Sequence, residues 1–208
     1  MRHIKGYCLF IIFTLLLTGC ASVEKPVENE KFPSNTKITI ESYNMSEKER
    51  LLISKTGVEQ IEFFKLNCTL KEDDDLQFSV EVFEKGKFKE ELQKTWDGPE
   101  TKYKDSLISF GISDTRDEGH SLKLINGIPT GLATTFYSNN MTSSSFSKLI
   151  DEKLTLEKNK PIYLVAWLGT TKNSLHSGGG ENGELPPGIE ESELAFLYKV
   201  LWTDKEKK

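Results

Sequence analysis

Apolar and polar residues alternate along most of the chain between Lys37 and Trp202, and a period of two is typical of β-strands with one buried face. The charged run at 71–75 predicts a turn, so the segments on either side of it, 58–70 and 76–83, are expected to form an antiparallel hairpin. The alternation predicts strands over 38–40, 58–70, 76–83, 88–92, 108–112, 121–125 and 132–137.

Three further segments depart from strict alternation. Residues 162–168 and 194–202 are apolar almost throughout, which is typical of central strands buried on both faces. A helical spacing of apolar residues predicts a short helix near 143–154, with serines at its start that would cap it. The residues with this spacing are Phe146, Leu149, Ile150 and Leu154.

Together these elements predict an all-β fold in which two antiparallel sheets pack as a sandwich. The layout resembles that of immunoglobulin-like exported domains, although the Cys and Trp spacing of antibody domains is absent. Residues 36–203 are expected to form a single domain, followed by a charged tail at 204–208. A domain of roughly 165 residues buries about 70% of its unfolded surface, which is adequate without disulfides.

The first twenty residues have the pattern of an export signal. Arg2 and Lys5 form a basic start, and an apolar run over 7–17 follows. This run is shorter than the roughly 20 residues of a membrane-spanning helix and has the length of a signal-peptide core. Leu17 ends this run, and Thr18, Gly19 and Cys20 come directly after it.

These four residues resemble the lipobox of bacterial lipoproteins. The resemblance implies that Cys20 receives a lipid on its thiol, that residues 1–19 are removed as a signal peptide, and that the protein stays on the outer face of the cell membrane. An ordinary secretory signal and an uncleaved anchor are the alternatives. Residues 20–35 are polar and contain Pro26 and Pro33, so they predict a flexible tether that spans about 20 Å.

The charge of the chain narrows the range of partners. With 27 Lys and Arg against 32 Asp and Glu, the net charge is −5, and removal of Arg2 and Lys5 with the signal takes it to −7. Binding to nucleic acid through general electrostatics is therefore excluded. An acidic body is also expected to be repelled by an anionic bilayer, so the lipid on Cys20 is expected to provide the attachment.

Three cysteines occur in the chain. Cys8 leaves with the predicted signal and Cys20 carries the predicted lipid, so Cys68 has no partner for an intramolecular disulfide in the mature chain. Cys68 belongs to the alternating apolar set of its segment, and it is expected to be a small buried residue of the core.

No catalytic motif is present, and we assign no catalytic residue, cofactor or metal ion from the sequence. The loop 114–120 carries three carboxylates and His120, which are groups that can bind a cation. Its spacing does not match an EF-hand, and Arg116 stands among the acidic residues, so the pattern favours a solvated loop. The acidic run at 72–75 is likewise interpreted as a solvated turn.

The long segment 170–191 is rich in Gly and Pro, and it connects the two strongly apolar strands. Loops of this length in a compact domain are usually functional or disordered, so the segment is interpreted first as a mobile excursion. A binding lip formed by His176, Glu181 and Glu184 is the alternative. Among the tryptophans, Trp167 and Trp202 are expected in the core and Trp96 at the surface.

The sequence therefore favours a lipid-anchored, extracytoplasmic binding module of the cell envelope without enzymatic activity. Its expected partners are the membrane, through the lipid on Cys20, and an envelope protein, glycan or small ligand. The alternative function is an envelope hydrolase that uses His120 or His176 with nearby carboxylates. A solute-capturing lipoprotein with two α/β lobes would need a longer chain with less β-structure.

Overall fold

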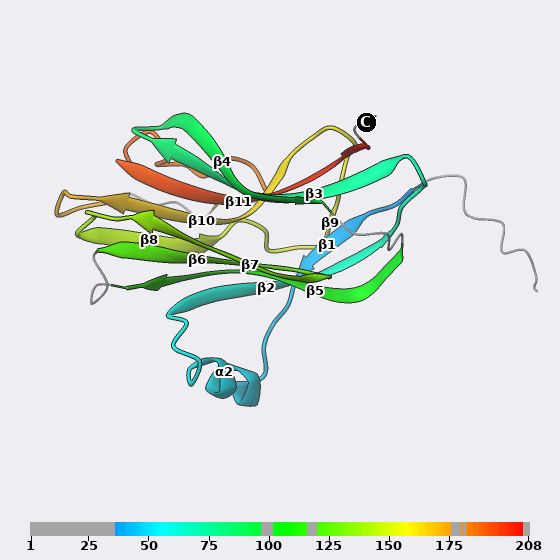
Figure 1. Ribbon diagram of the computed structural model, residues 1–208, viewed down its shortest axis with the longest axis horizontal. Coiled ribbons are helices and arrows are strands. Elements are labelled where there is room, and N and C mark those ends of the chain that lie inside the picture. Colours follow the sequence, from blue (N-terminus) through cyan, green and yellow to red (C-terminus); the bar gives the residue numbers. More distant parts are fainter. Residues whose placement is uncertain (1–35, 97–101, 116–119, 176–179, 181, 206–208) are drawn as a thin grey trace, which may run out of the picture. The chain divides into compact units, whose positions relative to one another are not determined.

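Two antiparallel sheets face each other in the computed structural model, which describes residues 36–96, 102–115, 120–175, 180 and 182–205 (Figure 1). Within these residues, a six-stranded sheet has the order β7-β6-β5-β2-β1-β9 and a five-stranded sheet has the order β4-β3-β11-β10-β8. The arrangement confirms the predicted all-β sandwich. Asn35–Lys208 forms one compact unit.

The strands of the six-stranded sheet are β1 (Thr39–Ser42), β2 (Gln60–Thr69), β5 (Lys102–Asp114), β6 (Ser121–Ile128), β7 (Gly131–Ser138) and β9 (Leu154–Thr155). The strands of the five-stranded sheet are β3 (Asp74–Glu84), β4 (Lys87–Trp96), β8 (Ser143–Lys148), β10 (Ile162–Thr170) and β11 (Leu194–Asp204). A short helix, α2 (Glu47–Ile53), lies on the side of the six-stranded sheet that faces away from its partner sheet (Figure 1).

The core lies between the two sheets and follows the alternation of the sequence. Apart from register shifts, inward and outward residues alternate along β2, β3, β5 and β11, and the inward Phe64, Phe78, Phe110 and Tyr198 are fully buried. The rings of Phe110 and Tyr198 stack at 5.3 Å between their centroids and join the middle of one sheet to the middle of the other. Cys68 is buried in the same core, as expected.

The predictions for the two apolar segments are confirmed. Residues 162–168 lie in β10 and 194–202 lie in β11, and these strands pair with each other. Strand β11 is the middle strand of its sheet, and its outward-facing Leu197 is buried in a second, smaller apolar cluster on the outer face. A strand with two buried faces needs apolar residues at every position.

The predicted hairpin between 58–70 and 76–83 is wrong. Strand β2 pairs with β1 and β5, whereas β3 pairs with β4 and β11 in the other sheet. The chain therefore crosses from one sheet to the other after Thr69. Alternation reveals which face of a strand is buried, but it carries no information about which strand lies beside it.

The predicted helix near 143–154 is also wrong, because its first part forms β8 and its last part forms β9. Phe146 lies opposite Trp167 of β10 and packs against the core, so the period in this segment is two. The serines that looked like a helix cap are strand residues. The helical spacing arose because Leu149 and Ile150 are buried in two different apolar clusters after the strand ends.

Helix α2 was not predicted, although a local signal for it exists. Ser46 caps the helix by accepting from the Glu49 N–H, and the Glu49 carboxylate accepts in return from the Ser46 N–H. This capping box marks a helix start in sequence. No residue of α2 is buried. Among the described residues, no helix has the length and apolar character that a membrane span requires.

The turn between β3 and β4 allows a direct test of the fold. Lys85 and Gly86 have φ angles of 51° and 71°, the conformation of a tight two-residue hairpin turn. A Cβ at Gly86 would lie 2.7 Å from the Cα of Glu190. We therefore expect Gly86→Ala to lower the free energy of unfolding by about 1–3 kcal/mol in urea titrations.

The control is Gly131→Ala, because a Cβ at Gly131 meets nothing within 4 Å. Its free energy of unfolding should stay within about 0.5 kcal/mol of wild type. Equal stability of both variants would contradict the turn geometry.

Candidate functional site

A polar cleft opens at one end of the sandwich, where β5 ends and β6 and β8 begin. Two adjoining hollows of about 420 and 340 Å³ form it, and they share Asp114, Asn139, Met141 and Thr142. We call this the end cleft. Its main polar groups come from Glu59, Asp114, His120, Asn139 and Thr142.

Backbone hydrogen bonds hold the rim of the end cleft in place. The Asn139 N–H donates to the carbonyl oxygen of His120 at 2.8 Å, and the Thr142 N–H donates to that of Thr170 at 3.0 Å. The side chain of Asn139 accepts from the Met141 N–H at 3.0 Å, a local turn that Asn forms readily. The chain between β7 and β8 therefore spans the gap between the sheets in a defined conformation.

Apolar residues form the floor of the end cleft. Trp167 is 2% exposed and packs against Phe196, with 5.3 Å between the ring centroids. A Cβ at Gly169 would collide with the Trp167 ring and with Met141, so only glycine leaves both side chains in their places. The cleft thus combines an apolar floor with a polar rim, which is the usual composition of a small-ligand site.

The charge of the end cleft is negative. Its described lining contains the carboxylates of Glu59 and Asp114 but no Lys or Arg. Glu59 accepts from the Asp114 N–H at 3.4 Å, which places the two acidic residues next to each other. Carboxylates attract cations and repel anions, so the cleft suits a neutral or positively charged ligand.

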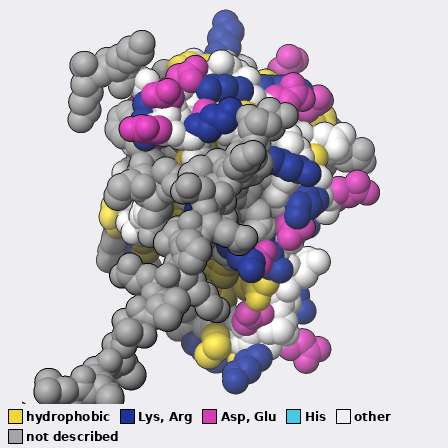
Figure 2. Space-filling view, turned by 90° about the vertical axis from the view of Figure 1, so that its right-hand side faces the viewer, with side chains coloured by type: hydrophobic (Ala, Val, Ile, Leu, Met, Phe, Trp, Pro, Cys, Tyr) yellow, Lys and Arg dark blue, Asp and Glu magenta, His cyan; other side chains and the backbone are white. Residues whose placement is uncertain are grey.

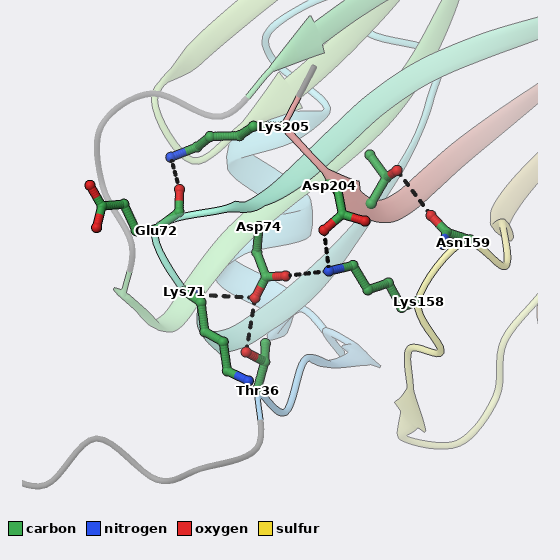
Figure 3. Close-up of polar contacts among 9 residues, drawn as sticks. Thr36, Lys71, Glu72, Asp74, Lys158, Asn159, Asp204 and Lys205 are labelled. Carbon is green, nitrogen blue, oxygen red and sulfur yellow. Dashed lines mark hydrogen bonds and ion pairs between the residues drawn. The ribbon is translucent and has the colours of Figure 1, made fainter. Parts of the chain in front are cut away.

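The opposite end of the sandwich carries an ion-pair cluster around Asp74 (Figure 3). The Asp74 side chain is 3% exposed and accepts from Thr36 Oγ1 at 2.9 Å, from the Lys71 N–H at 3.1 Å and from Lys158 Nζ at 2.9 Å. Lys158 also donates to Asp204 at 2.6 Å. The first described residues and the last strand are therefore held together at this end.

The acidic run at 72–75 is thus only partly a solvated turn. Asp74 and Asp75 begin β3 and are buried, whereas the exposed Lys71, Glu72 and Asp73 form the turn. The predicted tail at 204–208 begins too early, because Asp204 belongs to β11 and the Lys205 N–H donates to the carbonyl oxygen of Asp73 at 2.9 Å. In the end view of Figure 2, basic and acidic side chains lie next to each other.

A third polar group lies on the outer face of the five-stranded sheet. Lys199 binds Glu81 at 2.6 Å and Glu91 at 2.5 Å, and all three side chains are largely buried. Tyr163 donates to Glu81 and Ser79 donates to Glu91. Burial lowers the pKa of Lys199, but the two carboxylates outweigh it and raise that pKa. Because these groups satisfy one another, we interpret the network as structural.

The sequence profile of the YgaN domain matches residues 39–201. The chain belongs to the YgaN domain family. The match begins at the first residue of β1 and ends within β11, so the YgaN domain is the sandwich itself. No curated protein and no solved structure matches the chain.

The end cleft of the YgaN domain contains part of the predicted site. Asp114 and His120 of the loop 114–120 lie at its rim, while 116–119 are outside the described residues. His120 has a φ of 54° and is exposed. In the part of the chain that the structure describes, no group of three or more Cys, His, Asp or Glu side chains is arranged to hold a metal ion.

The predicted lip of 170–191 does not reach the end cleft with its described residues. His176 and Glu181 lie outside the described part of the chain. Glu184 is exposed and does not line the end cleft. The backbone N–H of the neighbouring Gly183 donates to the carbonyl oxygen of Leu149, and its carbonyl oxygen accepts from the Tyr163 N–H. Ile189 belongs to the second apolar cluster. The segment 182–193 therefore covers the outer face of the five-stranded sheet.

Sequence reasoning missed Glu59, Asn139 and Thr142. The pair Asn139-Asn140 at the end of a predicted strand was the available signal, because Asn is typical of turns. As expected, Trp167 is a core residue and Trp202 packs against the core. The structure does not describe the side chain of Trp96.

The ion-pair cluster predicts a specific dependence of stability on pH. Burial raises the pKa of Asp74, but hydrogen bonds from Lys158, Lys71 and Thr36 outweigh it and lower the pKa to about 2. The folded pKa is then below the usual value of 3.8, so the carboxylate stabilises the fold above pH 4 and loses this effect as the pH falls toward 2. Asp74→Asn should lower the free energy of unfolding by about 2 kcal/mol at pH 7.

The same variant should show a smaller change of stability between pH 4 and pH 2 than wild type. The control is Asp151→Asn, whose side chain is 72% exposed and whose loss should leave the pH profile unchanged. Denaturant titrations at several pH values measure both variants. Identical profiles for Asp74→Asn and wild type would show that Asp74 is not the titrating group.

Proposed function

We propose that this chain is a lipid-anchored, extracytoplasmic binding module whose end cleft takes a ligand with hydroxyl and amino groups, such as the amino-sugar units of an envelope glycan. The observation that carries the proposal is the separation of the two ends of the sandwich. The chain enters the domain at Thr36, beside the ion-pair cluster, and the end cleft opens at the far ends of the same strands. A strand of 11 residues such as β3 separates the ends by about 35 Å.

This separation supports the combination of an anchor and a binding site. Cys20 precedes Thr36 in the chain, and Thr36 lies at the end of the sandwich away from the cleft. The cleft then stays open to ligands in the envelope. An apolar floor with a rim of amide, hydroxyl and carboxylate groups also matches the needs of a polyhydroxylated ligand with a positive charge.

Binding is favoured over hydrolysis by the polar groups around His120. Among the described residues, no hydrogen bond joins the His120 side chain to a carboxylate or hydroxyl group. The nearby hydroxyl groups of Thr115 and Ser121 bond to each other at 2.8 Å. A catalytic nucleophile needs a base within hydrogen-bond distance. The described hydrogen bonds do not join His120 to such a group, so its position near Asp114 does not favour a hydrolase. His176, the other candidate, lies outside the described residues.

Labelling of cells with radioactive palmitate tests the anchor. Wild-type protein should incorporate the label, and Cys20→Ser should not, because the thiol is the acceptor of the lipid. Cys68→Ser is the matched control and should be labelled like wild type, since Cys68 is buried in the core. Equal labelling of wild type and Cys20→Ser would refute lipidation at this residue.

Titration with glucosamine oligomers tests the cleft. Because a charge-assisted hydrogen bond contributes about 1.5–3 kcal/mol, Asp114→Asn combined with Glu59→Gln should weaken binding at least about tenfold. Asp151→Asn, with an exposed carboxylate outside the cleft lining, should bind like wild type. The N-acetylated oligomer lacks the amino charge and should bind less tightly than the free amine. Unchanged affinity in the double variant would place the site elsewhere.

A further inference from the structure

Exposed apolar side chains gather on one side of the molecule. The described part of the chain has seven large hydrophobic residues that are strongly exposed, and five of them belong to α2 or point outward from the six-stranded sheet. These five are Leu51 (59% exposed), Leu52 (60%), Leu107 (46%), Leu132 (68%) and Phe136 (58%). The remaining two, Phe88 and Leu185, belong to the five-stranded sheet and to the segment that covers it. Such clustering on a soluble domain marks a contact surface.

The strand pattern explains why these residues face outward. In β5, Ile108 and Phe110 fill the core, so Leu107 points to the other side. In β7, Tyr137 packs on the core and Phe136 is directed away from it. A strand with a solvated outer face normally has polar residues at these positions.

Helix α2 extends the same apolar surface. Leu52 lines a small apolar hollow of about 200 Å³ together with Tyr43, Phe63 and Leu107, where the helix lies against the sheet. Leu51 is exposed and does not line this hollow. Figure 1 shows α2 below the six-stranded sheet, on the side away from the five-stranded sheet. The helix therefore presents leucines outward without contributing to the core.

Basic residues lie among the apolar ones. Lys65 is opposite Leu107 in the sheet, and Lys123 is opposite Phe136. Lys102 and Lys104 also belong to the outward set of β5, because Tyr103 between them is buried in the core. Helix α2 and its C-terminal turn add Lys48, Arg50 and Lys55.

Several of the acidic residues on this side already have partners. Glu49 accepts from Ser46 and Tyr43, and Asp105 accepts from Asn67. Glu41 lies 3.6 Å from Lys153. The outer surface combines positively charged side chains with exposed apolar groups.

An acidic segment covers the opposite side of the sandwich. The segment 182–193, which covers the outer face of the five-stranded sheet, contains Glu184, Glu190, Glu191 and Glu193 and no Lys or Arg. Lys199 on that face is held between Glu81 and Glu91. This acidic segment thus lies on the side opposite to the five exposed apolar residues.

We propose that the outer face of the six-stranded sheet, together with α2, docks on an anionic lipid bilayer. Leu51 and Leu52 enter the interface, and the surrounding Lys and Arg side chains pair with lipid phosphates. The acidic segment 182–193 points away from the membrane, which lowers the repulsion expected from the net charge. The end cleft then opens sideways along the membrane surface. This orientation rests on the proposed lipid anchor, which raises the local concentration of the domain at the bilayer.

Sedimentation with lipid vesicles tests the proposal without the anchor. The protein is the chain from residue 20 onward with Cys20→Ser; it retains the compact unit Asn35–Lys208. The vesicles consist of phosphatidylglycerol mixed with phosphatidylcholine, or of phosphatidylcholine alone. The protein should bind the anionic vesicles at least about tenfold more tightly than the neutral ones, and added salt should weaken the binding.

Two matched pairs of variants locate the contact. Leu51→Ser with Leu52→Ser should lower the affinity for anionic vesicles about tenfold, because two exposed leucines no longer enter the interface. Leu185→Ser removes a leucine of similar exposure, 48%, from the other side and should bind like wild type. Arg50→Glu should weaken binding, whereas Lys160→Glu, at a 62% exposed site near Glu157, should not.

Thermal unfolding of each variant shows whether it is folded. Because no residue of α2 is buried, the helix variants should be as stable as wild type.

Equal binding to both kinds of vesicle, or wild-type binding by the double leucine variant, would overturn the proposal. If the variant instead loses a concentration-dependent dimer, the surface is an interface between two copies. Because the assay uses an unlipidated chain, its failure leaves the anchor at Cys20 untouched, and failed palmitate labelling leaves this surface untouched.

Discussion

The fold depends on the burial of β11 between β3 and β10, with its aromatic residues directed at the opposite sheet. Tyr198 stacks on Phe110 of β5, and Phe196 packs on Trp167 of β10, so one strand joins the two halves of the core. In the described part of the chain no disulfide assists this contact, and Cys68 is simply one of the buried residues. Apolar burial between the sheets is therefore the main source of stability.

A rigid core of this kind separates two ends with different chemistry. At one end Asp74 accepts from three partners, and Lys158 connects it to the last strand. The carboxylate oxygens of Asp74 accept from partners within the fold, which suits a structural role. At the other end Glu59 and Asp114 lie beside each other at the rim of the end cleft, and the described lining contains no Lys or Arg. The same strands hold both ends apart.

The distribution of charge is a further consequence of the two-layer architecture. Alternation along each strand assigns every charged residue to the inner or the outer face, and each sheet has only one outer face. Alternation thus places Lys65 and Lys123 on one side of the molecule, and the segment with Glu190 and Glu191 covers the other. A net charge averages over both sides, so it describes the solubility of the chain better than the character of either surface.

Local periodicity and apolar content were sufficient to predict the strand-rich fold class, most strands, the central position of 194–202 and the burial of Cys68. Tertiary structure decided that β2 and β3 lie in different sheets and that 143–148 is a strand. It also brought Glu59, Asp114 and Asn139 together, although 80 residues separate the first from the last. Strand partners and convergent loops depend on how distant segments close around the core, and local sequence patterns contain no record of that closure.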